Sequence, residues 1–184
     1  MGTFVDCALR LSTGESIVVR AACLDDAATV LAHGRAVIEE DEFNVTSSEE
    51  YSFTEDQERD WVEQYASDPA KLFIIAESAR QMIGMLFLET KSRKKISHVA
   101  TLHMSVNKDW RDRGVGTALL QSAIEWAHSH PVIEKLGLAV FSSNTRAIGL
   151  YRKMGFVEEG RRLREVKFAS GQYVDDILMH RFVK

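Results

Sequence analysis

The first half of the chain alternates between strand-like and helix-like patterns of apolar residues. Residues 16–22 are rich in β-branched side chains and predict a strand, whereas residues 24–40 carry apolar side chains at helical spacing and predict a helix. The polar and acidic segment 41–53 indicates a loop. Residues 54–66 begin with TEDQ, a capping-box pattern, and predict a second helix.

The middle of the chain is dominated by strand patterns. Residues 72–77, 82–90 and 97–106 predict three strands that follow one another with only short polar connections. Because parallel strands need much longer crossovers, we expect these strands to be antiparallel neighbours.

After residue 106 the pattern changes to alternating helix and strand. We predict a helix over 114–128, a strand over 136–141 and a helix over 144–154 that Asn144 caps. Such a crossover implies right-handed, parallel pairing of the flanking strands. The chain then ends in strands at 156–159, 163–168 and 174–182, with a hairpin turn at 169–172.

Length and composition predict one compact domain over 1–184, with 1–15 as an N-terminal extension or a first strand. No apolar run approaches the ~18 residues of a membrane span, and we see no secretory signal. Cys7 and Cys23 lack the spacing of a redox or metal motif, and the histidines are scattered. We therefore expect a cytoplasmic protein with no bound metal and no membrane contact.

The charge is unevenly distributed. The net charge of −4 argues against a nucleic-acid partner held by a broad basic face. Residues 39–63 contain eleven acidic side chains and one arginine, which leaves the rest of the chain with an excess of positive charge. The acidic segment is either a solvated surface or a source of attraction for cations.

Residues 111–116, RDRGVG, form a glycine-rich turn directly before an apolar helix. Such a turn exposes backbone amides at a helix N-terminus and suits a pyrophosphate, with Arg111 and Arg113 as further donors. It lacks the third small residue of a dinucleotide-binding fingerprint, since position 119 is Leu, and Gly116 is followed by Thr117 without the lysine of a Walker loop. On these residues alone, an ordinary turn before a core helix remains the alternative.

A second motif follows at 144–156, NTRAIGLYRKMGF. Together with the glycine turn at this separation, the sequence resembles the GNAT superfamily of acetyl-CoA-dependent N-acyltransferases. Its motif A matches 102–106, 111–116 and the helix from Thr117, and its motif B matches 138–156. The resemblance implies a mixed α/β fold: a mostly antiparallel twisted sheet with one parallel strand pair splayed for CoA, flanked by about four helices.

The resemblance also implies a cofactor site for acetyl-CoA. The glycine turn is expected to bind the pyrophosphate through backbone amides. The strand ending at Val106 is expected to pair with the pantetheine arm, at a place where the family has a bulge. Asn144 is expected near the pantetheine. The implied cofactor-binding residues are Met104, Val106, Arg111, Asp112, Arg113, Gly114, Val115, Gly116, Thr117, Asn144 and Ala147.

Catalysis by direct attack of an amine on the thioester needs a proton donor for the sulfur and a base for the amine. Tyr151, which the resemblance places near the sulfur, is our candidate general acid. Many relatives use a glutamate on the motif A strand as the base, but residues 97–106 contain no carboxylate. His103, with Thr101 on the same face by parity, is the candidate base; His98 and a water chain are the alternatives.

We therefore expect an N-acetyltransferase whose acceptor is a primary amine of a small molecule or peptide. The acidic segment 39–63 favours a cationic acceptor, if it is more than a solvated surface. Homodimers are common in the family, which allows a homodimer here. The alternative is a non-catalytic CoA-binding sensor or assembly module of the same fold. A nucleotide-dependent enzyme that binds ATP or NAD is disfavoured by the missing motif residues.

Overall fold

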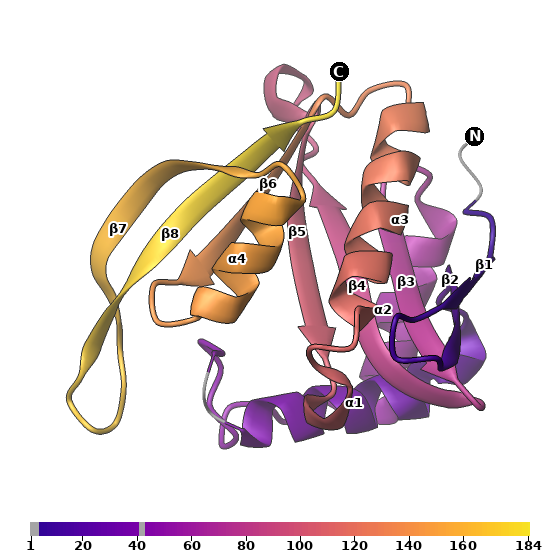
Figure 1. Cartoon of the computed structure of the whole chain (residues 1–184), viewed down its shortest axis with the longest axis horizontal. Helices are drawn as coiled ribbons and strands as arrows, with labels where there is room; N and C mark the ends of the chain where they lie inside the picture. The colour runs from indigo at the N-terminus through magenta and orange to yellow at the C-terminus, as the bar shows by residue number, and fades with distance from the viewer. Residues whose placement is uncertain (1–3, 41–42) are drawn as a thin grey trace.

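The described residues form an eight-stranded sheet in the order β1-β2-β3-β4-β5-β6-β8-β7, and the helices pack on it (Figure 1). The computed structural model describes residues 4–40 and 43–184. All neighbouring strands are antiparallel except β5 and β6. The strands are β1 (Cys7–Arg10), β2 (Ser16–Ala21), β3 (Leu72–Ser78), β4 (Gln81–Thr90), β5 (Val99–Val106), β6 (Lys135–Phe141), β7 (Val157–Lys167) and β8 (Tyr173–Phe182).

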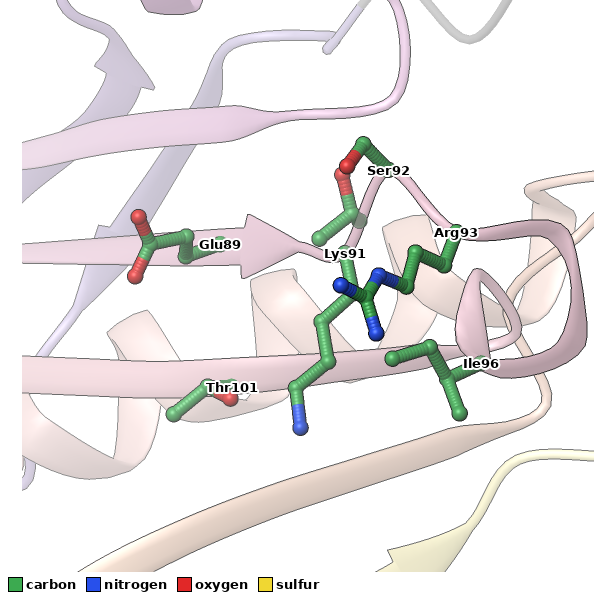
Figure 2. A pocket seen from close by; sticks show the side chains of 7 residues that line it. Glu89, Lys91, Ser92, Arg93, Ile96 and Thr101 are labelled. Atoms are coloured by element: carbon green, nitrogen blue, oxygen red, sulfur yellow. The ribbon is translucent and has the colours of Figure 1, made fainter.

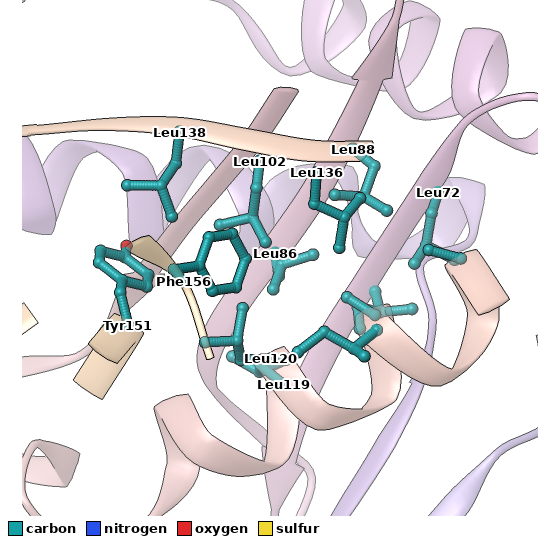
Figure 3. Close-up of a cluster of buried hydrophobic side chains, with 14 of the residues drawn as sticks. Leu72, Leu86, Leu88, Leu102, Leu119, Leu120, Leu136, Leu138, Tyr151 and Phe156 are labelled. Carbon is teal, nitrogen blue, oxygen red and sulfur yellow. The ribbon is translucent and has the colours of Figure 1, made fainter. Parts of the chain in front are cut away.

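In the described part of the chain, four α-helices cover the two faces of the sheet, as the resemblance implied. They are α1 (Ala27–Glu39), α2 (Glu55–Ser67), α3 (Val115–Ser129) and α4 (Thr145–Lys153). Alternation along β3 shows the two layers: Leu72 and Ile74 pack with the residues of α3, while Phe73 and Ile75 pack with those of α1 and α2. Figure 3 shows the α3 side of this core, where Leu119 and Leu120 meet leucines of the sheet.

The parallel pair β5–β6 opens partway along its length. The two strands pair only from Val99–Lys135 to Thr101–Gly137. Beyond that point β5 continues to pair with β4 as far as Val106, and β6 continues to pair with β8 as far as Phe141. The predicted splayed pair is therefore confirmed, and Thr101 and Gly137 mark its closed end.

Several element boundaries differ from those expected. Strand β5 begins at Val99, because residues 94–96 form a short 3-10 helix and the chain turns before the strand starts. The two strands expected at 156–159 and 163–168 are one strand, β7, interrupted by register shifts at Glu158/Gly160 and Arg162/Val166. Arg164, with a φ of 52°, lies inside the second irregularity, which explains why the alternation breaks there.

The remaining expectations on the N-terminal side are met in the described residues. Within the first fifteen residues, Cys7–Arg10 form strand β1. Thr54 caps α2 with both bonds of the capping box. The segment expected to be a loop has no helix or strand at 43–53, and its first two residues, Asp41 and Glu42, lie outside the described residues.

Candidate active site

The glycine turn lies between the end of β5 and the start of α3. A short 3-10 helix at Lys108–Trp110 leads into it. Asp112 and Gly114 both have positive φ values, 60° and 99°, and Gly114 is the N-cap of α3. The first helical bond runs from the amide of Ala118 to the carbonyl of Gly114. The amides of the first turn therefore have no carbonyl partner within the helix and are available to an anion.

Gly116 allows α3 to approach its neighbours closely. A Cβ atom at this position would lie 3.0 Å from Leu150 Cδ2 on α4, and 3.6 Å and 3.8 Å from side-chain atoms of Met104 and Val106 on β5. The start of α3, the open end of β5 and α4 thus meet at one place. This brings together Met104, Val106 and Gly116, three of the residues expected to bind the cofactor.

The arginines of the turn already have partners. Arg111 donates from Nε to the Val106 carbonyl at 3.0 Å and forms an ion pair with Glu40 at 2.5 Å. Arg113 pairs with Glu15 at 3.0 Å and lies over the Trp110 ring. The turn as it stands offers backbone amides more readily than free guanidinium groups. The assignment of 111–117 to the pyrophosphate stays a prediction.

The bulge expected on β5 is not found among the described strands. β4 and β5 keep a continuous register from Gly84–Val106 to Thr90–Ala100. A Cβ at Gly84 would lie 2.9 Å from the Ser105 carbonyl oxygen, so the glycine permits close, regular pairing there. A register shift, which indicates a bulge or irregularity, does occur in the neighbouring pair of strands, between β3 and β4 at Ala76/Glu77. That expectation was wrong, although residues 102–106 of β5 still have no strand partner on the β6 side.

Helix α4 places Tyr151 beside the opening. Asn144 caps the helix by accepting a hydrogen bond from the Ala147 amide at 3.1 Å, so the side-chain oxygen of Asn144 already has a partner. Tyr151 is buried next to Phe156, and Figure 3 shows its ring close to Leu138, on the part of β6 that has separated from β5. Burial raises the pKa of Tyr151 to about 12, so the phenol keeps its proton at neutral pH.

His103 lies on the opposite face of β5, toward α1 and α2. Its ring stacks on Phe87 with centroids 4.6 Å apart and an interplanar angle of 12°. The side chain is exposed, yet the atoms packed around the ring desolvate it and lower its pKa, while the Glu89 carboxylate acts in the other direction. His98 precedes β5, and its carbonyl accepts amide bonds from Glu134 and Lys135 at the closed end.

Two residues on this face were missed from the sequence. Glu89 on β4 pairs with Thr101, so a carboxylate does face the same side as His103, but from the neighbouring strand. His33 on α1 lies with Nε2 2.9 Å from Ser105 Oγ. Burial lowers the pKa of His33 to about 4, so it is neutral at physiological pH. Counting the hairpin register back from Thr101 would have identified Glu89; no sequence signal indicated His33.

A hollow of about 340 Å³ opens at the closed end of the splay, on this same face (Figure 2). It is lined by Glu89, Thr90, Lys91, Ser92, Arg93, Ile96 and Thr101.

Across residues 4–40 and 43–184, the histidines, cysteines and carboxylates form no group of three that could hold a metal ion. In the same residues, no helix has the length and apolar character needed to cross a membrane.

Comparison with known proteins places these features in a family. The model of the acetyltransferase (GNAT) family matches residues 36–156. The chain is 32% identical over 121 residues to the L-amino acid N-acetyltransferase AaaT of Escherichia coli (strain K12), covering 66% of this chain and 74% of that protein. It is 26% identical over 103 residues to a spermidine N(1)-acetyltransferase of Vibrio cholerae, covering 56% and 58%.

A solved structure agrees over nearly the whole chain. The acetyltransferase of GNAT family from Streptococcus pneumoniae superimposes with a TM-score of 0.87 at 28% identity, covering 90% of this chain and 99% of that one. The family match includes the splayed strands, the glycine turn and Tyr151. This chain therefore belongs to the GNAT family of acetyltransferases.

Proposed function

We propose that the protein transfers the acetyl group of acetyl-CoA to a primary amine, with both substrates bound together. The observation that carries the proposal is the opening of β5 from β6 beyond Thr101–Gly137, directly beside the amides at the start of α3. An unpaired strand edge and a helix N-terminus, arranged in this order, fit a ligand with an amide-containing arm and a pyrophosphate.

The donor site is assigned to main-chain groups. The amides of residues 112–117 would bind the pyrophosphate, since the Arg111 amide already donates to the Lys108 carbonyl. The edge of residues 102–106 that has no strand partner on the β6 side would pair with the pantetheine arm. Gly116 lets the start of α3 pack against Leu150 of α4 and the side chains of β5, because a Cβ there would lie 3.0 Å from Leu150 Cδ2. This packing holds the amides of the turn beside the open end of β5. Acetyl-CoA bound in this way supplies a thioester that a neutral amine can attack.

The acceptor enters from the face of α1 and α2. An alkylamine with a pKa near ~10 is mostly protonated at neutral pH and must lose a proton before it can attack. His103 is the proposed proton acceptor. Its lowered pKa leaves the imidazole neutral near pH 7, and Glu89 nearby stabilises the charge it gains.

Tyr151 is the proposed general acid. It lies on the other face of the opening, buried beside Leu138 and Phe156, and holds its proton at neutral pH. A phenol in this position can donate to the sulfur as negative charge develops there. The amine therefore loses its proton on one face of the sheet, and the sulfur receives a proton on the other.

The location and assembly of the protein are also proposals. The described cysteines, Cys7 and Cys23, are free, which supports a reducing compartment such as the cytoplasm. We further propose that residues 1–184 act as a single catalytic domain, with a homodimer as the assembly to test.

Tyr151→Phe tests the mechanism. We expect kcat to fall by about 10²-fold, because the proton donor is lost, while the Kd for acetyl-CoA changes little. Unchanged turnover would exclude Tyr151 as the acid. Acetyl-CoA binding by the unmodified protein without thiol release, across polyamines, amino acids, aminoglycosides and peptide N-termini, would indicate a sensor instead of an enzyme.

A further inference from the structure

The hollow beside Thr101 lies where the two substrates would meet. Thr101 pairs with Glu89 on β4 and with Gly137 on β6, so it occupies the closed end of the splay. Its side chain faces the same side of the sheet as His103, which is about 7 Å further along β5 at 3.3–3.4 Å per residue. A small molecule in this hollow therefore lies within reach of the proposed base.

Two cationic side chains enter the hollow. Figure 2 shows Lys91 and Arg93 directed into the space in front of β5, with Thr101 on that strand and the Glu89 carboxylate further back along β4. Within residues 4–40 and 43–184, no ion pair joins either cation to a carboxylate. By contrast, the cations Arg111, Arg113 and Lys135 each have a carboxylate partner.

The lining around the two cations suits a small anionic group, while Glu89 adds a carboxylate on the same face beside Thr101. Thr101 contributes a hydroxyl group on the face of His103, and this hydroxyl can donate a hydrogen bond. The residues from Lys91 to Lys95 include four cations and no carboxylate, so the turn keeps a positive potential. Ile96 adds an apolar side chain to the lining.

This site is separate from the pyrophosphate site. The glycine turn follows the other end of β5, and Thr101 and Val106 are about 17 Å apart along the strand. The cations of the hollow are therefore too far away to bind the pyrophosphate held at the start of α3.

We propose that Lys91 and Arg93 bind the carboxylate of the acceptor, and that the acceptor is an α-amino acid. This inference rests on the proposed acetyl transfer and names its substrate class. The carboxylate pairs with the two cations and the Thr101 hydroxyl, and the α-amine lies on the side of Glu89 and His103. A polyamine would place its positive charges against Lys91 and Arg93 and is disfavoured. This differs from the cationic acceptor that the acidic segment 39–63 suggested, and it treats that segment as a solvated surface. The amino-acid specificity in the name of the relative AaaT agrees with this substrate class.

The test compares acceptors that differ only in the carboxylate. Thiol release from acetyl-CoA is measured with L-leucine, L-phenylalanine and L-methionine, with the carboxamide of each, and with spermidine. After correction for the fraction of unprotonated amine, we expect kcat/KM for the amino acids to exceed that for the carboxamides by about ten-fold or more, because the charge-assisted contacts are lost.

Substitutions at the two cations locate the site. Lys91→Met and Arg93→Met are each expected to raise KM for the amino acids by about ten-fold while kcat/KM for the carboxamides stays within about two-fold. Both side chains are exposed, so the fold should be unaffected. Lys95→Met is the matched control, because it removes a charge from the same turn at a residue that does not line the hollow.

The outcomes separate this inference from the proposed function. Three results would overturn the carboxylate site and leave acetyl transfer intact. The first is an equal kcat/KM for amino acids and their carboxamides, and the second is an equal loss of kcat/KM for these two kinds of acceptor in Lys91→Met and Arg93→Met. The third is acetylation of spermidine alone. No thiol release with any of these amines would contradict acetyl transfer itself, and the acceptor class with it.

Discussion

The hydroxyl group of Tyr51 occupies the space that a Cβ atom at Gly34 would need. The same hydroxyl donates a hydrogen bond of 2.9 Å to Glu58 Oε1. Tyr51 thus connects the segment after α1 to both α1 and α2. Because these two helices cover the face on which the acceptor is proposed to bind, this contact helps to shape that face.

Gly34→Ala is expected to lower the free energy of unfolding by about 1–3 kcal/mol, because the new methyl group collides with Tyr51. In a Tyr51→Ala background the same change should stabilise by about 0.5–1 kcal/mol, since alanine favours the helix. Urea unfolding measures both effects. Gly149→Ala in α4 is the control, because a Cβ there meets no atom within 4 Å and should stabilise in either background. The same loss at Gly34 in both backgrounds would argue against the Tyr51 contact.

His33 should make stability fall with acid. Its pKa is lowered from 6.5 to about 4 by burial, so the unfolded chain binds a proton in this range that the folded protein does not. The contribution of neutral His33 to the free energy of unfolding is roughly 3 kcal/mol. This contribution is fully present above pH 6.5 and is lost as the pH falls toward 4. Unfolding free energies at several pH values should show a flatter dependence in His33→Gln. The exposed His128→Gln should keep the wild-type slope; an unchanged slope in His33→Gln would refute the assignment.

Gly114 is expected to control cofactor affinity through its backbone. Its φ of 99° is unfavourable for any other residue, and Gly114→Ala introduces strain of order 1–3 kcal/mol at the start of α3. Calorimetric titration should show the Kd for acetyl-CoA rising by about ten-fold. Gly171→Ala imposes the same strain at a hairpin turn, with φ of 86°, and should reduce stability without altering that Kd. Equal Kd values for acetyl-CoA in Gly114→Ala and Gly171→Ala would show that the glycine turn does not determine cofactor affinity.

His103 should produce the acidic limb of the pH–rate profile. Activity should rise with pH as the imidazole loses its proton, with a midpoint below 6.5 because desolvation lowers the pKa. His103→Ala should remove this limb and reduce kcat/KM by about 10²-fold. His98→Ala tests the alternative base and should leave the profile intact. If the limb survives in His103→Ala and disappears in His98→Ala, the assignment of the base is wrong.

Much of the fold could be predicted because the pattern of apolar residues follows local geometry. The alternation of Ala100 and Leu102 with Thr101 and His103 sets which side of β5 is buried. The glycine turn and the capping residues Thr54 and Asn144 depend on contacts within a few residues, so their spacing was informative.

The details that were missed depend on register or on distant packing. Glu89 reaches the face of His103 only because β4 and β5 pair as they do, and His33 meets Ser105 across 72 positions of sequence. The partners of Arg111 and Arg113 are likewise remote, at Glu40 and Glu15. The expected bulge failed because Gly84 lets β4 pair regularly with the end of β5.

The most direct test of acetyl transfer is identification of the product. The protein is incubated with acetyl-CoA and a panel of amino acids, polyamines, aminoglycosides and N-terminal peptides, and thiol release is followed while the products are analysed by mass spectrometry. We predict release of one thiol for each molecule of amine acetylated on nitrogen. Tight binding of acetyl-CoA with no acetylated amine anywhere in the panel would contradict the account.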